Sequence, residues 1–319
     1  MKTAFAFPGQ ASQEVGMGTE LRGQYPEAAE LFKRANDALG FDIAGLIESG
    51  PLEKLTLTEN AQPGILLASY AAYVVLVKET GVKPDYLLGH SLGEYTALCA
   101  SRAVDFEDAI KLVRLRGKYM QEACPEGQGA MAAIMGIGGF KVGMLVDMAR
   151  GAGILDVANY NSPQQLVISG DREAVERACG MASELGAKKC VMINVSAPFH
   201  SGLMRPAAER FKAELGKVNF KEPRIPVIAN YHAEPYPGKD AIVSLLTKQI
   251  DRPVLYYQSV EYLFNNGVDT LIEVGPGKVL TGLNKRIVPK DKEIAMGNFG
   301  KPDDLATVRE ILGGGAPGA

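Results

Sequence analysis

The chain has little of several features that mark whole classes of proteins. Its 319 residues contain 34 lysines and arginines against 37 aspartates and glutamates, a net charge of −3. The sequence therefore lacks the basic excess that binding to nucleic acid requires. Only three histidines are present, and the four cysteines show neither close pairing with one another nor a metal-binding spacing with those histidines. We expect reduced, buried thiols and no metal site.

Long apolar runs are also scarce. The most apolar stretch, residues 65–77, is interrupted by Ser69, Tyr70 and Tyr73 and is shorter than a membrane span. The first residues show no long apolar region and no cleavage site of the kind that marks a secretory signal. We expect a cytoplasmic protein with no membrane partner, in which residues 65–77 form part of a buried helix. With 46% hydrophobic residues, the chain can bury a core of enzyme size.

A serine flanked by glycines is the most informative local feature. Residues 88–94 read LGHSLGE, which places Ser91 two residues after one glycine and two before another. An apolar run precedes the motif and helix formers follow it, so strand, turn and helix occur in the order of a nucleophile elbow. Glycines at these positions let the chain reverse without steric clash. Ser91 is therefore a candidate nucleophile, and the alternative is a loop serine that caps a helix.

Apolar strand-like runs alternate with helical patterns through most of the chain, which predicts an α/β fold with a mostly parallel sheet. The runs and helices lie at residues 3–7, 27–39, 65–79, 86–88, 226–230 and 270–274. Between residues 129 and 195 the order changes to strand, helix, strand, strand, helix, strand, as in a ferredoxin-like unit. These pieces lie at residues 130–135, 140–150, 155–160, 165–169, 172–185 and 188–194.

The domain organisation follows from this change of pattern. We expect a large domain made of residues 1–128 and 196–305, with residues 129–195 inserted as a small ferredoxin-like domain. Residues 306–319 should form the end of a C-terminal helix and a flexible, glycine-rich tail. A ligand is expected in the cleft between the two domains.

A reactive serine needs a base, and only three imidazoles are available. His90 is the chain neighbour of Ser91, and adjacent side chains in a tight turn point in different directions. His232 is interpreted as a surface or hydrogen-bonded histidine. His200 lies where the chain re-enters the large domain, which makes it the better candidate for the general base.

Arg116 stands out because of helical geometry. Over residues 105–123 it falls in the middle of an apolar face, whereas Arg114 and Lys118 fall on the opposite, polar side. The apolar residues on its face are Ala109, Leu112, Val113, Met120 and Ala123. A cation in such surroundings is unfavourable unless it is paired. It has either a buried acid as its partner or an anionic ligand, and its planar fork suits a carboxylate.

Two strand-to-helix turns complete the set of motifs. Residues 7–13 (FPGQASQ) follow the first predicted strand, so their backbone lies at the carboxyl edge of the sheet, where ligands bind. A backbone amide there, together with that of Leu92, could stabilise an oxyanion. The turn at residues 273–280 lacks the spacing of a phosphate loop and is interpreted as structural.

Together these segments resemble the malonyl-CoA:acyl carrier protein transacylases. The motifs that carry the resemblance are FPGQ at residues 7–10, GHSLGE at 89–94, Arg116, APFH at 197–200 and EVGPG at 273–277. Five motifs agree in order and spacing, and the resemblance extends over residues 1 to about 300. It implies an α/β-hydrolase-like large domain, an inserted ferredoxin-like domain and an active site in the cleft between them. Free-standing acyltransferases of polyketide synthases are similar to nearly the same degree.

The resemblance assigns roles that agree with the motifs. It implies that Ser91 is the nucleophile, His200 the general base and acid, and Arg116 the clamp on the malonyl carboxylate. It adds that a main-chain carbonyl, matched here by Gln249, orients the histidine. The remaining assignments are the amides of Gln10 and Leu92 as the oxyanion hole, and Met120, Asn161 and Phe199 as residues that bind the substrate. Phe199 resembles the form of its motif that is associated with malonyl rather than branched acyl groups.

The implied reaction is a ping-pong transfer of malonyl from coenzyme A to the phosphopantetheine thiol of holo acyl carrier protein. It needs neither a metal nor a bound cofactor, and we expect a monomer. The carrier is expected to be acidic, so a basic rim is needed near the cleft. Its candidates are Lys188, Lys189, Lys285 and Arg286.

Three alternatives stay open at this point. A serine esterase or thioesterase would share the serine and the base but would transfer the acyl group to water. A polyketide acyltransferase would use another acyl donor. A carrier-protein docking module would keep the site without its chemistry.

Overall fold

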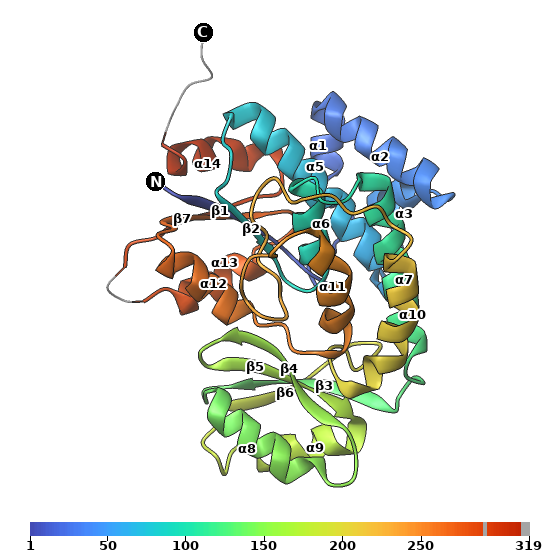
Figure 1. The fold of residues 1–319 in the computed structure, drawn as a ribbon, viewed down its shortest axis with the longest axis vertical. Coiled ribbons are helices and arrows are strands. Elements are labelled where there is room, and N and C mark those ends of the chain that lie inside the picture. The colour runs from blue at the N-terminus through green and yellow to red at the C-terminus, as the bar shows by residue number, and fades with distance from the viewer. Residues whose placement is uncertain (290–291, 314–319) are drawn as a thin grey trace.

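The computed structural model describes residues 1–289 and 292–313 and contains two separate sheets (Figure 1). Residues 314–319, which include most of the predicted tail, lie outside the described residues. The short helix α14 (Leu305–Ile311) precedes them. The chain is therefore a mixed α/β protein with one parallel and one antiparallel sheet.

The parallel sheet has the strand order β2-β1-β7-β8. Its strands are β1 (Thr3–Phe7), β2 (Tyr86–Gly89), β7 (Thr270–Val274) and β8 (Ala295–Phe299). Every residue of β1 and β7 is buried, as expected for central strands of a parallel sheet covered on both faces. The carboxyl ends of β1 and β2 meet at one edge, so the turns that follow them lie side by side.

Helices surround this sheet and bury its two faces. They are α1 (Thr19–Gln24), α2 (Pro26–Leu39), α3 (Ile43–Ser49), α4 (Leu52–Thr56), α5 (Thr58–Thr80), α6 (Leu92–Ala100), α7 (Phe106–Glu122), α10 (Arg205–Leu215), α11 (Ile242–Asp251), α12 (Tyr256–Asn265), α13 (Val279–Ile287) and α14. Helix α7 packs against α5 and α10 through the apolar face predicted for it. That face places Arg116 in the interior of the protein.

The predicted strand at residues 226–230 is wrong. This segment lies beside β2 but makes only single bridges, between Leu87 and Val227 and between Ile228 and Pro235. Pro226 has no N–H to donate, and the chain turns back at once, so that Tyr236 N–H bonds to the Val227 carbonyl. The segment therefore extends the sheet edge without forming a strand.

The antiparallel sheet has the order β4-β5-β3-β6 and packs against two helices, which lie below it in Figure 1. Its elements are β3 (Gly129–Met135), α8 (Gly139–Arg150), β4 (Leu155–Ser162), β5 (Gln165–Asp171), α9 (Arg172–Met181) and β6 (Lys189–Ile193). The succession of strands and helices is the predicted one, although α9 ends before residue 185. A core of its own lies between the sheet and the two helices.

Helix α5 is longer than the sequence pattern predicted. It begins at Thr58 rather than residue 65 and tolerates Pro63 within its first turns. With 23 residues it is long and apolar enough to cross a membrane, yet 78% of its most apolar window is buried inside the protein. Such burial is what the central helix of a globular core shows, and no second helix in the described part of the chain passes the same test.

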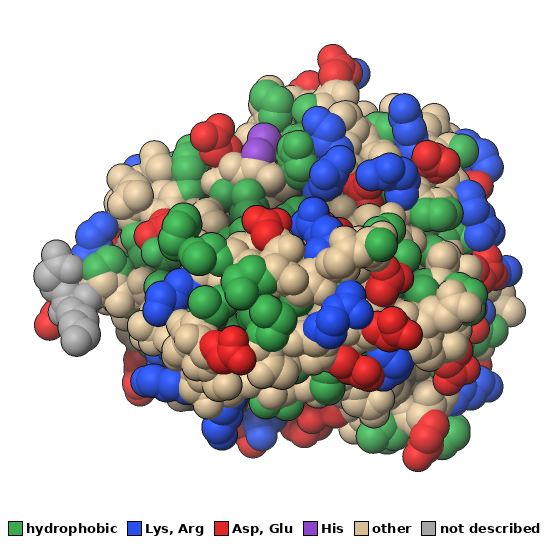
Figure 2. Space-filling model, turned by 90° about the horizontal axis from the view of Figure 1, so that it is seen from below, with side chains coloured by type: hydrophobic (Ala, Val, Ile, Leu, Met, Phe, Trp, Pro, Cys, Tyr) green, Lys and Arg blue, Asp and Glu red, His purple; other side chains and the backbone are tan. Residues whose placement is uncertain are grey.

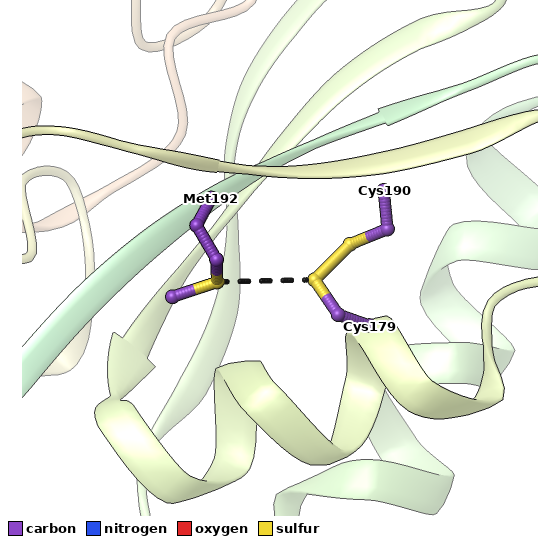
Figure 3. The surroundings of a disulfide bond; sticks show 3 residues. All are labelled: Cys179, Cys190 and Met192. Carbon is purple, nitrogen blue, oxygen red and sulfur yellow. Dashed lines mark hydrogen bonds between the residues drawn. A yellow bond between two sulfur atoms is a disulfide. The ribbon is translucent and has the colours of Figure 1, made fainter.

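Two of the four cysteines correct the expectation of reduced thiols. Cys179 on α9 and Cys190 on β6 form a disulfide, with Met192 beside it (Figure 3). Helix α9 crosses the sheet so that these residues, which are 11 positions apart, come together. Cys99 and Cys124 are free and buried, as expected.

Seen from the end occupied by the antiparallel sheet, the surface shows hydrophobic side chains (Figure 2). Helix α8 exposes Phe140, Met144 and Met148.

Candidate active site

Ser91 lies in the sharp turn between β2 and α6, at φ 52° and ψ −104°. A side chain at Gly89 would collide with the backbone of Gly93, and one at Gly93 with the backbone carbonyl of Phe7. The two glycines are therefore required by close backbone packing. Asn230 holds the turn from behind, since its Oδ1 accepts the Ser91 N–H at 2.7 Å and its Nδ2 donates to the Gly89 carbonyl at 2.7 Å.

His200 is the imidazole that reaches the serine. Its Nε2 lies 2.7 Å from Ser91 Oγ, and its Nδ1 lies 2.7 Å from the main-chain carbonyl oxygen of Gln249. A carbonyl can only accept, so Nδ1 carries the proton and Nε2 is free to accept the serine proton. The structure thus brings together the predicted nucleophile, base and orienting carbonyl from three distant parts of the chain.

Burial keeps this imidazole neutral. His200 is 4% exposed, and desolvation, followed by the nearby charge of Arg116, lowers the pKa of His200 to about 3. The hydrogen bond that Nδ1–H donates to the Gln249 carbonyl opposes the shift without cancelling it. A neutral imidazole in contact with a serine hydroxyl is the resting state that general-base catalysis requires.

The Arg116 guanidinium also contacts the serine hydroxyl. Its Nη2 donates to Ser91 Oγ at 3.0 Å and to Gln249 Oε1 at 2.9 Å, and its Nη1 donates to Gln62 Oε1 at 2.9 Å. The group lies 5.3 Å from the centre of the Tyr95 ring. It is 1% exposed, and no carboxylate within the described residues contacts it. A buried cation held by neutral amides is well placed to receive an anion.

The two predicted oxyanion donors belong to neighbouring turns that both border the cleft. Leu92 is the first residue of α6, so its N–H has no acceptor within the helix. Gln10 follows β1 in the adjacent turn and lines the cleft together with Ser91 and Leu92. The backbone N–H of Gln10 makes no hydrogen bond within residues 1–289 and 292–313.

A cleft between the two sheets exposes these groups to ligands. The predicted substrate-binding residues Met120, Asn161 and Phe199 all line it. Asn161 Oδ1 lies 2.8 Å from His90 Nε2. The imidazole of His90 therefore bonds to Asn161 and not to the serine hydroxyl. Apolar side chains of the antiparallel sheet and of the loop that follows β6 complete the wall, namely Met131, Val167, Ile193 and Val195.

Several buried polar groups that support the site were missed by the sequence reasoning. Glu94, 1% exposed, accepts hydrogen bonds from Tyr236 Oη, from Gln249 Nε2 at 2.6 Å and from Asn230 N–H at 3.1 Å. Burial raises the pKa of Glu94 to about 7. A glutamate within α6, the helix of the elbow, whose residues are all buried, was a signal of such a role. Gln62, one turn before the apolar run of α5, gave none.

The predicted basic rim is only partly at the cleft. Arg286 Nη1 donates to Gln165 Oε1 at 2.5 Å, and Gln165 lines the cleft. Lys285 instead lines a separate hollow near Asp269. No group of three or more histidine, cysteine, aspartate or glutamate side chains that could hold a metal ion occurs in the described part of the chain.

Comparisons with known proteins point to one family. The profile of the acyl transferase domain matches residues 4–297. A malonyl CoA-acyl carrier protein transacylase of Escherichia coli O157:H7 is 47% identical over 308 residues, which are 97% of this chain and 99% of that protein. The enzyme of the same name from Bacillus subtilis strain 168 is 46% identical, over 92% of this chain and 93% of the relative.

Solved structures agree with this similarity. A malonyl CoA-acyl carrier protein transacylase from Coxiella burnetii superposes with a TM-score of 0.94 at 39% identity and 98% coverage of both chains. A malonyl-transacylase in complex with the acyl-carrier protein of a type II polyketide synthase gives a TM-score of 0.94 at 40% identity, over 97% of this chain and 99% of that one.

Proposed function

Because this chain belongs to the acyl transferase domain family, we propose that it transfers a malonyl group from malonyl-CoA to the phosphopantetheine thiol of an acyl carrier protein. The names of its relatives support this activity. The single observation that carries the proposal is the buried Arg116 guanidinium, which contacts Ser91 Oγ and has neutral amide partners. It supplies a positive charge next to the reacting hydroxyl, where a dicarboxylic acyl group would place its free end.

In the first half of the reaction, Ser91 Oγ attacks the thioester carbonyl carbon while His200 Nε2 takes the hydroxyl proton. The oxyanion of the tetrahedral intermediate accepts hydrogen bonds from the Gln10 and Leu92 amides. The carbon–sulfur bond then breaks, and His200 returns the proton to the sulfur. Coenzyme A leaves as a thiol, and a malonyl ester remains on Ser91.

The second half reverses these steps with a new thiol. The phosphopantetheine thiol gives its proton to His200, and its sulfur attacks the ester carbonyl carbon. The bond to Ser91 Oγ breaks, and His200 returns the proton to that oxygen. Throughout, the Gln249 carbonyl holds Nδ1–H and stabilises the transient imidazolium, the part that a carboxylate plays in a Ser-His-Asp triad.

Selectivity depends on both ends of the acyl group. Arg116 pairs with the malonyl carboxylate, and its planar fork suits two parallel hydrogen bonds. Phe199 fills the wall of the cleft beside His200, so an α-methyl branch on the acyl group meets an aromatic ring. One methylene typically changes binding by about 1 to 3 kcal/mol, so this discrimination is incomplete.

The finer description of the fold is part of the same proposal. The order β4-β5-β3-β6, with α8 and α9 on one face, supports a ferredoxin-like small domain formed by residues 129–195. The elbow at Ser91 supports an α/β-hydrolase-like large domain formed by residues 1–128 and 196–305. We also propose a monomer without a bound cofactor, since all the residues invoked come from one chain. A cytoplasmic location stays a prediction.

Arg116 separates this function from a serine esterase, and it provides the test. We expect intact-mass measurements to show a malonyl adduct that moves to holo carrier protein and is not lost to water first. Arg116→Ala should lower the rate constant of acylation by malonyl-CoA about a hundredfold, the size of a lost charged, bidentate contact, and that by acetyl-CoA less than threefold. Arg114→Ala is the matched control, because Arg114 stacks on Phe41 away from the cleft. Equal losses for both substrates would refute the clamp.

A further inference from the structure

A buried carboxyl group, that of Glu94, lies behind Arg116 and is linked to it through one amide. The Gln249 side chain accepts from Arg116 Nη2 at its Oε1 and donates from its Nε2 to Glu94 Oε2 and to the Ser91 carbonyl, at 2.6 and 2.8 Å. Gln249 is 0% exposed and Glu94 is 1% exposed. The three groups form a continuous chain of hydrogen bonds away from solvent.

The direction of this amide is not fixed by its shape, because the oxygen and nitrogen ends of a glutamine are nearly the same size. It is fixed by its neighbours. Glu94 Oε2 already accepts the Asn230 N–H at 3.1 Å, so it presents an acceptor to Gln249, and the Ser91 carbonyl presents another. With Nε2 held by two acceptors, Oε1 must face the guanidinium.

A reversed amide would remove the guanidinium's anchor. The NH₂ group would then face Arg116 Nη2, donor against donor, and one of the two amide oxygens that hold the guanidinium would be lost. His200 would not be affected in the same way, because its partner is the main-chain carbonyl of Gln249 within α11, which the side-chain amide does not control.

From this arrangement we infer that Glu94 is a positioning residue for the carboxylate clamp, acting through the Gln249 amide to hold Arg116 toward the acyl group. The inference rests on the proposed malonyl transfer. Glu94 lies outside the set of described residues that line the cleft, so it acts on the substrate only through the other two. Tyr236 and Asn230 fix the carboxyl group in turn.

The test compares acylation of Ser91 by malonyl-CoA and by acetyl-CoA under single-turnover conditions. Glu94→Met removes both acceptor oxygens, and we expect the malonyl-to-acetyl ratio of rate constants to fall about tenfold, the size of one lost hydrogen bond to a charged group. Glu94→Gln keeps an acceptor at the Oε2 position and should change the ratio less than threefold. Glu94→Leu, which also removes both acceptor oxygens, is the second variant if the methionine variant does not fold.

Two controls separate positioning from a general loss of structure. Glu273 is another buried glutamate of the large domain, and its carboxylate caps the start of α13. Glu273→Met should lower the melting temperature without changing the ratio. In an Arg116→Ala background, Glu94→Met should leave the ratio within twofold, because the group through which it acts is absent.

Three results would overturn the inference: an unchanged ratio in folded Glu94→Met or Glu94→Leu, an equal fall in Glu273→Met, or an additive effect in the Arg116→Ala background. Failure of the proposed function looks different. In that case the wild-type protein itself forms no malonyl adduct, whatever residue 94 is.

Discussion

The two sheets contribute to the cleft in different ways. The large α/β part supplies the groups to which we assign acyl transfer, namely Ser91, His200 and the Arg116 clamp, and each is fixed by buried polar partners. The antiparallel sheet supplies Asn161 and apolar side chains such as Met131, and it holds a disulfide and an exposed apolar face on its far side.

This difference suggests a division of roles, with the chemical steps in the large part and recognition of partners in the small one. Buried charges work only when their positions are fixed by a dense set of partners, and the large core with its surrounding helices provides such partners. A small sheet with two helices has a thinner core. It can shape the cleft and meet partners, and changes in it should affect stability and binding more than the chemical steps.

The largest effect should come from the serine. Ser91→Ala removes the nucleophile, and we expect acyl transfer to fall by about 10⁴-fold or more, with no covalent adduct by intact mass. Ser12→Ala is the matched control, since Ser12 also lines the cleft but bonds to the Gly9 carbonyl. An adduct on the Ser91→Ala protein would place the nucleophile elsewhere and break the division between the two parts.

The pH dependence should show how strongly the large part buries its base. A histidine with an ordinary pKa of about 6.5 would lose about thirtyfold in base form between pH 8 and 5. The pKa of His200 is lowered to about 3, so the rate constant for acylation by acetyl-CoA, which does not use the clamp that Glu94 supports, should fall less than twofold over that range. An apparent pKa near 6.5 in single-turnover rates would show that the imidazole is solvated.

The same shift affects stability with a definite sign. Between about pH 3 and 6.5 the unfolded chain binds a proton at this histidine that the folded protein does not bind. The free energy of unfolding should therefore fall as the pH drops through that window, by up to about 1.4 kcal/mol per pH unit. Urea unfolding of wild type and His200→Asn at pH 7 and 5.5 measures the difference, which should shrink in the variant.

The disulfide tests the other part of the molecule. Cys190→Ser removes the disulfide to Cys179, which lies 11 residues away in the chain. The loss should lower the free energy of unfolding by about 2 to 3 kcal/mol. Acylation by malonyl-CoA should change less than twofold. Cys124→Ser, at a free and buried cysteine, should leave the response to reductant unchanged. If reduction of the wild-type protein has no effect on urea unfolding, the link does not contribute to stability.

The smallest effect concerns the rim between the two parts. Arg286→Glu reverses a charge that contacts Gln165 at the cleft. We expect the KM for an acidic carrier protein to rise about three- to tenfold, and acylation by malonyl-CoA to stay unchanged. Lys285→Glu makes the same charge change at the neighbouring residue, which faces another hollow, and should have little effect. Equal changes in KM for the two variants would show that only the overall charge of the protein matters, and not the position of Arg286 at the cleft.

The sequence by itself determined what depends on local geometry. Glycines around Ser91 predict the elbow because the turn has no room for side chains there, and helical periodicity predicts that Arg116 faces the interior. The base could be chosen because only three histidines are present. The link between Cys179 and Cys190 was missed, since no short spacing marks it and the crossing of α9 over β6 decides it.

Tertiary structure decided what surrounds these groups. Whether Arg116 has an acid or an amide as its partner depends on Gln62 and Gln249, which lie 54 and 133 residues away in the chain. Glu94 and Gln249 are 155 residues apart and meet only when α6 and α11 converge behind the elbow. Local propensity acts over a few residues, whereas the partners of a buried charge are selected by the packing of the whole core.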